Sequence, residues 1–414
     1  MAEDVSFETA SSRTGWQSPL GYLARSVLRR LSHLTHEGSL RVELPSGEEV
    51  LFGTGTDTRI PTIQVHHYRA FWKIVRRGAI GFSEAYMDGD IDADDLVGFF
   101  EYFLKNRTQF EEKTPGFVKS GFMDRILHLA RRNSKRGSRR NITEHYDLGN
   151  AFYRLWLDEK MIYSSACYGP GAETLEDAQK VKLQKITDLV KLTGQEKILE
   201  IGCGWGALAL HIAAQSGARV EGITLSDEQL AYARDAAREA GLSDRCSFVL
   251  KDYRDQEGAY DRIVSIEMIE AVGEAYWPDY FKVLHDRLKD GGSAVIQAIT
   301  IDEARYESYR NSAEFIQRYI FPGGMLPTRE IMEEQAVKAG LRTDHVELFG
   351  QSYAQTLMDW RERFEDAWPE IAKLGFDEHF RRRWRYYLAY CEAGFRDGSI
   401  DVGFYRFVKD QRSG

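Results

Sequence analysis

The spacing of apolar residues in the first third of the chain predicts a mostly helical domain. Residues 20–34 carry them at helical intervals, which predicts one helix. Arginines stand among them, so this helix lies either on the surface or with one face against a core. Residues 39–52 have a Pro-Ser-Gly turn in the middle and predict a hairpin. The aromatic-rich residues 67–104 predict helices that break near Gly78 and Gly89.

Later in the chain the pattern changes to strands that alternate with helices, which is typical of an α/β fold with a parallel sheet. The expected strands are residues 197–201, 219–224, 246–250, 261–266 and 293–298. A long insertion follows at residues 301–327, and insertions of this length in compact domains are often functional lids.

Composition narrows the function of the chain. The 414 residues have a net charge of −9, so we expect no nucleic-acid partner. The sequence has no apolar run long enough to span a bilayer and no secretory signal at its start. Its four cysteines show no CxxC pairing, so we expect no metal site, no disulfide framework and a cytoplasmic setting. The basic residues 131–140 are either a solvated linker or a patch for anionic lipid headgroups.

A glycine-rich turn follows the first expected strand of the α/β region. Gly202, Gly204 and Gly206 would let backbone approach a ligand closely at the start of a helix. The spacing differs from the GxGxxG of dinucleotide folds. The second strand ends in Thr224, where dehydrogenases place an acidic residue. Asp252 and Tyr253, after the third strand, are suited to the edge and face of an adenine ring.

Several runs of this sequence resemble cyclopropane-fatty-acyl-phospholipid synthases and mycolic acid methyltransferases. These runs are residues 145–150, 163–166, 198–206, 222–229, 252–255, 261–266, 320–324 and 356–364. The resemblance covers about residues 50–410 and includes the amino-terminal domain of the phospholipid-acting members. It implies a Rossmann-like class I methyltransferase domain. The expected layout is a disordered tail at residues 1–18, a mostly helical lipid-binding domain at 19–130, a basic linker at 131–141 and the methyltransferase domain at 142–414.

The resemblance also implies a cofactor, S-adenosylmethionine, and a set of residues around it. The residues expected to bind it are Tyr163, Ser164, Gly202, Gly204, Thr224, Leu225, Gln229, Asp252, Tyr253 and Ile266. In this family a cis double bond attacks the sulfonium methyl, and a base then removes a proton. Removal from the new methyl group closes a cyclopropane, whereas removal from a neighbouring carbon leaves a methyl-branched alkene.

Cyclopropane synthases use a bound bicarbonate ion as the base, and two of its four positions differ here. Glu270 and Tyr353 keep the family's residue, whereas Ser165 replaces a cysteine and Gln297 replaces a histidine. Glu267 stands where cyclopropane synthases have a glycine, three residues before Glu270. It is either a built-in base in place of bicarbonate or an exposed residue at a helix start. The residues expected to take part in catalysis are Glu267, Glu270, Tyr353, Gln297, Ser165 and His145.

The sequence therefore predicts a peripheral enzyme at the cytoplasmic face of an anionic membrane. It would methylate unsaturated acyl chains of membrane phospholipid and give a methyl-branched product. Ring closure on the same substrate, with bicarbonate bound, is the alternative. A non-catalytic lipid-binding protein and a small-molecule methyltransferase are also open, as is a homodimer.

Overall fold

The chain folds into two compact units in the computed structural model, which describes residues 7–8, 19–32, 37–53, 55, 57–109, 148–311 and 315–411. Unit 1 takes in the described amino-terminal residues together with Glu307–Ile320 and Gly375–Asp397. Unit 2 takes in three ranges: the described residues of Leu129–Tyr306, then Phe321–Leu374, and the described residues from Gly398 onward. His145 and the basic residues 131–141 lie outside the described ranges, as does most of the expected tail.

Unit 1 contains a five-stranded sheet of which the sequence predicted only the central hairpin. Its order is β1-β3-β2-β4-β5, with β1 (Phe7–Glu8), β2 (Leu40–Glu43), β3 (Glu49–Phe52), β4 (Thr62–Val65) and β5 (Ile91–Ala93). Strands β2 and β3 pair antiparallel around Gly47, whose φ of 80° suits a glycine turn. The short β1 pairs with β3 and lies within residues 1–18, which the sequence predicted to be disordered. The mostly helical prediction for this region thus missed a sheet.

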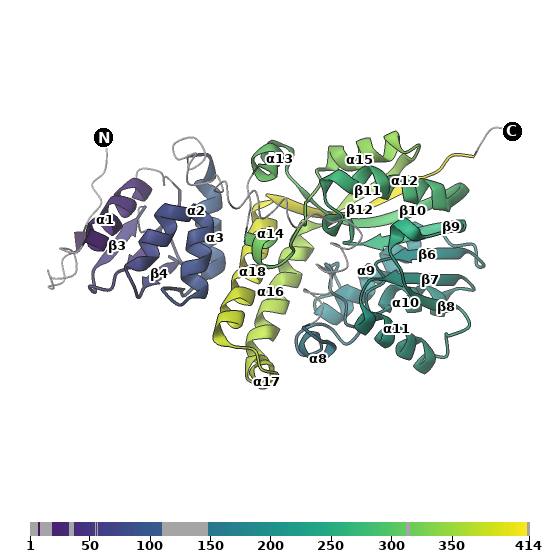
Figure 1. Ribbon diagram of the computed structural model, residues 1–414, viewed down its shortest axis with the longest axis horizontal. Helices are drawn as coiled ribbons and strands as arrows, with labels where there is room; N and C mark the ends of the chain where they lie inside the picture. The colour runs from purple at the N-terminus through teal and green to yellow at the C-terminus, as the bar shows by residue number, and fades with distance from the viewer. Residues whose placement is uncertain are drawn as a thin grey trace. The chain divides into compact units, whose positions relative to one another are not determined.

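In the part of unit 1 that the structure describes, the helices come from three separate parts of the chain (Figure 1). They are α1 (Pro19–Ser32), α2 (Arg69–Met87), α3 (Leu96–Lys105), α14 (Phe315–Tyr319) and α18 (Glu378–Asp397). Gly78 breaks α2 with φ 56° and ψ −131°, and Gly89 follows its end with φ 73°, so both predicted breaks are confirmed. Helix α18 packs against α2 and α3, and α14 packs against α2 and α18. The predicted domain boundaries did not include these last two helices.

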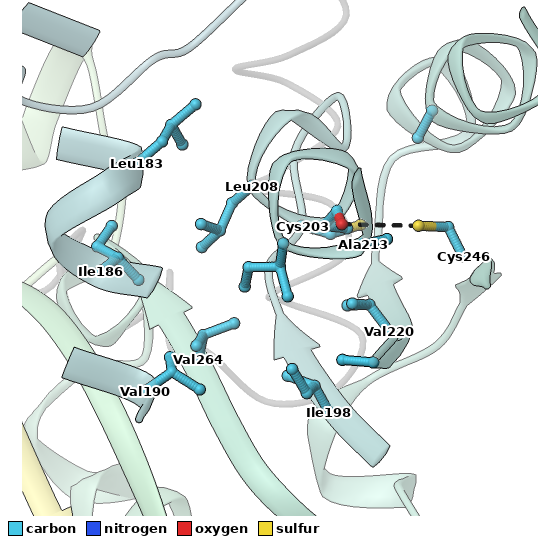
Figure 2. Packing of buried hydrophobic residues seen from close by; sticks show 14 of the residues in the cluster. Leu183, Ile186, Val190, Ile198, Cys203, Leu208, Ala213, Val220, Cys246 and Val264 are labelled. Carbon is cyan, nitrogen blue, oxygen red and sulfur yellow. Dashed lines mark hydrogen bonds between the residues drawn. The ribbon is translucent and has the colours of Figure 1, made fainter. Parts of the chain in front are cut away.

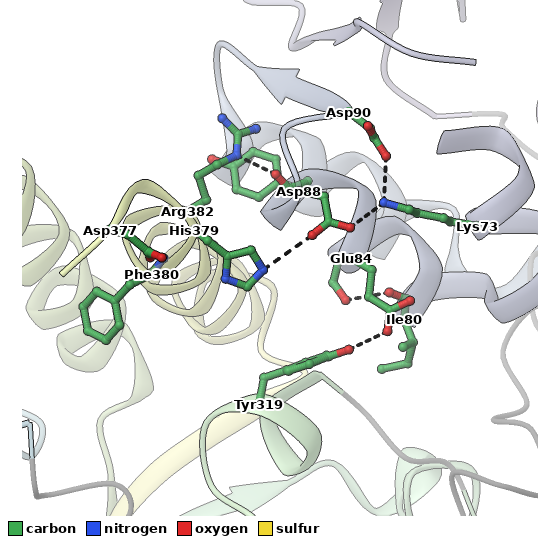
Figure 3. A network of polar contacts seen from close by, with 12 residues as sticks. Lys73, Ile80, Glu84, Asp88, Asp90, Tyr319, Asp377, His379, Phe380 and Arg382 are labelled. Atoms are coloured by element: carbon green, nitrogen blue, oxygen red, sulfur yellow. Dashed lines mark hydrogen bonds and ion pairs between the residues drawn. The ribbon is translucent and has the colours of Figure 1, made fainter. Parts of the chain in front are cut away.

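Polar contacts fasten α14 and α18 to the end of α2 (Figure 3). The Arg382 guanidinium donates to the carbonyl oxygen of Tyr86 and forms an ion pair with Asp92 at 2.7 Å. The Tyr319 hydroxyl donates to Glu84 at 2.6 Å, and His379 lies 3.5 Å from Asp88. Because these partners are far apart in sequence, the two segments form part of the fold of unit 1.

Unit 2 is built on a seven-stranded sheet of order β11-β12-β10-β9-β6-β7-β8 (Figure 1). Its strands are β6 (Lys197–Ile201), β7 (Arg219–Thr224), β8 (Cys246–Leu250), β9 (Tyr260–Ile266), β10 (Leu288–Ile301), β11 (Arg342–Leu348) and β12 (Ile400–Val408). The first five run parallel, and β12 pairs antiparallel with both β10 and β11. The chain runs outward from β6 to β8 and then crosses back to β9, so a topological switch point lies between β6 and β9. Open sheets of this kind bind ligands there, beyond the carboxyl ends of the strands.

Unit 2 also contains helices, most of which pack against this sheet. They are α8 (Asn150–Tyr153), α9 (Leu175–Val190), α10 (Ala207–Gln215), α11 (Asp227–Glu239), α12 (Trp277–Arg287), α15 (Arg329–Lys338), α16 (Gly350–Asp366) and α17 (Trp368–Lys373); α13 (Glu303–Arg310) crosses the boundary between the units. Figure 2 shows Leu183 and Ile186 of α9 with Leu208 of α10 in one apolar cluster with Ile198 and Val264 of the strands. This core fixes where the strand ends and the loops after them lie.

Candidate active site

The glycine-rich turn after β6 adopts the conformation that its glycines predict. Gly202, Gly204 and Gly206 have φ angles of 79°, 52° and 89°, in the left-handed region that side chains rarely adopt. A Cβ atom on Gly206 would lie 3.0 Å from Ala233 and Phe248, so this glycine allows tight packing. A Cβ on Gly204 would meet nothing within 4 Å. The turn therefore presents Gly204 to open space, where a ligand can approach the backbone.

The loop after β7 holds two of the predicted cofactor residues together. The Thr224 hydroxyl donates to the Gln229 side-chain oxygen at 2.9 Å, and both residues are buried. Ser226 caps α11, since its hydroxyl accepts from the Gln229 backbone N–H at 3.3 Å. Leu225 lies between these residues and is partly exposed. The side chains at this strand end are thus fixed before any ligand binds.

After β8, Asp252 was predicted to contact the edge of the adenine ring. Its carboxylate instead binds Arg254, a residue that the sequence did not single out. The Asp252 carboxylate accepts hydrogen bonds from Nε and from a terminal nitrogen of Arg254, at 2.8 and 2.6 Å. The signal for this pair was the two-residue spacing of the opposite charges. The Tyr253 ring packs edge-on against Tyr280, at 5.7 Å between centroids. Its hydroxyl is buried without a hydrogen-bond partner among the described residues. An orphaned hydroxyl at this strand end fits a site that a polar ligand completes.

An aromatic cluster borders the segment that carries Tyr163 and Ser164. The Tyr163 ring lies 5.5 Å from Tyr153, 5.6 Å from Trp156 and 5.2 Å from Trp360, between centroids. Trp205 in the glycine-rich turn donates to the Asn150 side chain at 2.6 Å. Of the motif at residues 145–150, the structure thus places the final asparagine at the turn.

The predicted reaction residues meet at the Glu267 carboxylate. One oxygen accepts from the Ser165 backbone N–H at 2.9 Å and from Gln297 Nε2 at 2.7 Å. The other oxygen accepts from the Tyr353 hydroxyl at 2.7 Å. The Ser165 hydroxyl donates instead to the carbonyl of Ala166, at 2.9 Å. Glu267 is half-buried and fully engaged, so the interpretation as an exposed helix-start residue is wrong.

Glu267 is held in a backbone conformation that favours glycine. Its φ is 48°, and the left-handed region costs a residue with a side chain about 1–2 kcal/mol. The backbone N–H of Glu267 donates to the carbonyl of Gln297 at 2.8 Å, which fixes this geometry. Strained conformations of this kind gather at functional sites. The hydrogen bonds to the carboxylate offset the strain, since bonds to charged groups contribute roughly 1.5–3 kcal/mol each.

Two carboxyl groups, those of Glu267 and Glu270, lie at the end of β9. Desolvation raises the pKa of Glu267, while bonds from Tyr353 and Ser165 favour its ionised form. Desolvation and then the charge of Glu267 raise the pKa of Glu270 to about 8. Glu270 accepts from the Ile299 N–H at 2.5 Å, and its other oxygen is buried without a partner among the described residues. At neutral pH Glu270 is therefore a neutral acid, whereas Glu267 is the carboxyl group whose ionised form receives hydrogen bonds from Tyr353 and Ser165.

The remaining predicted residues differ in how the structure places them. Ile266 ends β9 and is partly exposed beside this carboxylate. His145 lies outside the described ranges, so its predicted role stays untested. Within those ranges, no group of three or more His, Cys, Asp or Glu side chains is arranged to hold a metal ion.

A mixed sheet in this order, with five parallel strands, an antiparallel β12 and a glycine-rich turn after its first strand, defines a methyltransferase that uses S-adenosylmethionine. The sequence matches the family described as mycolic acid cyclopropane synthetase over residues 133–405, and the chain belongs to this family. The comparisons thus confirm the predicted fold class, family and cofactor.

Individual relatives include enzymes that differ in their product. The chain is 37% identical to a tuberculostearic acid methyltransferase of Mycobacterium tuberculosis, over 95% of this chain and 93% of that protein. It is 36% identical to a cyclopropane-fatty-acyl-phospholipid synthase of Escherichia coli, over 82% of this chain and 86% of that one. The structure of a cyclopropane synthase from Mycobacterium tuberculosis superposes with a TM-score of 0.62 at 31% identity, covering 66% of this chain and 98% of that chain. The chain is thus a methyltransferase, and these relatives act on lipids.

Proposed function

We propose that this enzyme transfers a methyl group to the cis double bond of an unsaturated acyl chain in membrane phospholipid, without closing a ring. The product is a methyl-branched, unsaturated acyl chain. The observation that carries the proposal is the position of the Glu267 carboxylate. It accepts from the Ser165 N–H, Gln297 and Tyr353, three of the four positions that the family resemblance assigns to bicarbonate. A carboxylate and a bicarbonate ion share a planar pair of acceptor oxygens, so Glu267 takes the place of the diffusible base.

S-adenosylmethionine supplies an electrophilic methyl group when bound. Gly202, Gly204, Thr224, Gln229 and Tyr253 would hold it, because they lie at or after the carboxyl ends of β6, β7 and β8, where Gly204 faces open space. The electron pair of the double bond forms the new C–C bond as the C–S bond breaks, which leaves a cation on the neighbouring carbon. The aromatic rings beside the site stabilise positive charge with their faces. Glu267 then accepts a proton from the chain, and the released electron pair forms the new double bond.

The resident base favours this outcome over a ring for a chemical reason. A tethered carboxylate can take a proton only from carbons within its short reach, whereas a diffusible ion can sit against the new methyl group. Gln297 also replaces a histidine, and its amide offers no titratable proton.

Access to phospholipid points to a membrane-facing surface on unit 1, and we place the enzyme at the cytoplasmic face of an anionic bilayer. All described, exposed large hydrophobic side chains of unit 1 lie on α1 and α2: Tyr22, Trp72 and Val75. Exposed arginines flank them at positions 25 and 29 of α1 and 69 and 76 of α2. Tryptophan and tyrosine beside basic residues suit the lipid headgroup region. Across the described ranges, every helix falls short of what a membrane span requires.

To test this proposal, the enzyme is expressed in a bacterial host that lacks cyclopropane lipids. The cells are grown with methionine that carries a trideuterated methyl group. We expect a branched, unsaturated product that retains three deuterium atoms, because the proton leaves from the chain. A saturated cyclopropane with two deuterium atoms contradicts the proposal. An exomethylene product with two deuterium atoms also contradicts proton removal from the chain: a hydride would first move from the methyl-bearing carbon to the cation, and the new methyl group would then lose the proton.

The membrane surface is tested by sedimentation with vesicles that contain anionic phospholipid. We expect Trp72→Ala with Arg76→Gln to lower binding by at least about tenfold, since a buried aromatic contributes about 1.5–3 kcal/mol. Leu374→Ala is the matched control, because Leu374 is also exposed (47%) but belongs to unit 2. Equal sedimentation of both variants and the parent contradicts this surface. Neutralising Arg131, Arg132, Lys135 and Arg136 tests the basic stretch separately.

A further inference from the structure

Two of the three buried polar residues of α9 donate hydrogen bonds to one serine beside the reaction site. The buried stripe of α9 is apolar except for Gln179, Lys182 and Thr187. The Gln179 amide donates to the backbone carbonyl of Ser164 at 3.0 Å. The Lys182 ammonium donates to the Ser164 hydroxyl at 2.7 Å, and only 1% of the residue is exposed. Burial disfavours the charged form of a lysine, and a nearby group of opposite sign opposes that effect.

The groups around Lys182 supply that partner. Desolvation lowers the pKa of Lys182, and four neighbouring acidic groups oppose this effect: Glu267, Cys167, Asp158 and Glu200. Desolvation raises the pKa of the Asp158 carboxyl and raises that of Glu200 to about 8, so Glu200 is neutral at pH 7. Burial also raises the pKa of the Cys167 thiol to about 11. Of these four groups, Glu267 raises the pKa of Lys182 most, and its carboxylate accepts three hydrogen bonds.

We propose that Lys182 is the positioning residue of the base: its bond to Ser164 aims the neighbouring Ser165 N–H at the Glu267 carboxylate, and its positive charge is a counter-charge to that carboxylate. This inference rests on the proposed role of Glu267 and adds a residue that touches neither reacting carbon. Tyr353 on α16 and Gln297 on β10 hold the carboxylate without contributing charge. Glu270 lies near it as a neutral acid. Lys182 is thus the cation that acts on Glu267 from α9.

The test is the pH dependence of kcat at saturating substrate, measured on the intact enzyme with lipid vesicles. Activity falls at low pH where Glu267 takes up a proton. Removing the counter-charge should raise the pKa of that carboxyl by roughly one unit or more. We therefore expect the acid limb of Lys182→Met to move up by at least one pH unit and its rate to recover at higher pH. Gln179→Leu is the matched control: it removes the other anchor of Ser164 but no charge, so its rate falls without a shift.

Each outcome distinguishes the two proposals. A lower rate in Lys182→Met with an unshifted acid limb contradicts the role of Lys182. An acid limb that persists in an active Glu267→Gln variant contradicts the proposed base itself. Calorimetric binding of S-adenosylmethionine verifies that each variant is folded. Should Lys182→Met fail to fold, Lys182→Gln, which keeps a donor for Ser164 without the charge, gives the same comparison.

Discussion

Replacing Glu267 with glycine should convert the resident base into a binding site for a diffusible one. The substitution suits the backbone, because φ at this position is 48°. It removes the carboxylate and leaves the Ser165 N–H, the Gln297 amide and the Tyr353 hydroxyl pointing into the vacated space. Relief of about 1–2 kcal/mol of strain partly offsets the lost bonds, so we expect a folded protein.

The magnitude follows from the role of a general base. Such groups contribute about 100- to 10,000-fold, so Glu267→Gly and Glu267→Gln should both lose at least 100-fold in rate. Added bicarbonate should restore Glu267→Gly by more than about tenfold, because the ion can occupy the vacated space. It should not restore Glu267→Gln, whose amide still fills that space. Ser165→Ala is the control and should stay within a few-fold of the parent, since the Ser165 hydroxyl bonds to Ala166 rather than to Glu267.

The assay is mass spectrometry of acyl methyl esters after incubation of purified enzyme, S-adenosylmethionine and unsaturated phospholipid in carbonate-free buffer. Parent activity should not change on addition of bicarbonate. The reasoning is refuted if Glu267→Gln retains more than about a tenth of the parent rate, or if the parent itself requires bicarbonate.

Further predictions concern neighbouring contacts. Tyr353→Phe removes the 2.7 Å donor to Glu267, so the acid limb of kcat should shift upward while the affinity for S-adenosylmethionine, measured by calorimetry, stays constant. Gly204→Val should abolish cofactor binding; Gly241→Val, where φ is 66° and the space is also open, should cost similar stability in thermal unfolding but leave binding intact. Equal binding by both glycine variants would remove Gly204 from the site. Arg382→Ala should destabilise unit 1 by about 2–4 kcal/mol in denaturant unfolding, because it breaks a buried network; a loss below about 0.5 kcal/mol contradicts this.

The sequence predicted the elements whose pattern is local. Strands β6, β7 and β8 have the predicted bounds, because each is a short run with turn or helix signals on both sides. The two antiparallel strands β11 and β12 were missed, since their pairing depends on partners far along the chain. For the same reason the sequence did not predict that α14 and α18 belong to unit 1, because this depends on long-range contacts such as that of Tyr319 with Glu84.

The site shows the same division between local and distant information. The family resemblance brought Ser165, Gln297 and Tyr353 to one place, and the structure joins them on Glu267. The predicted helix start was inaccurate, because Glu267 adopts a left-handed conformation before the short helix that holds Glu270. Lys182 was missed although a signal existed: a lysine interrupts the apolar stripe of α9. Only the structure identifies what that lysine faces.

The left-handed backbone at Glu267 has an evolutionary consequence. Codons for glycine and glutamate differ by a single second-position base, and this backbone accepts either residue without rebuilding the donors around it. A point mutation can therefore exchange a covalently attached base for a dissolved one in a protein that still folds. Branched and ring-containing lipids would then lie one mutational step apart, and lineages of this family could cross between them repeatedly, with selection on membrane fluidity deciding which form persists.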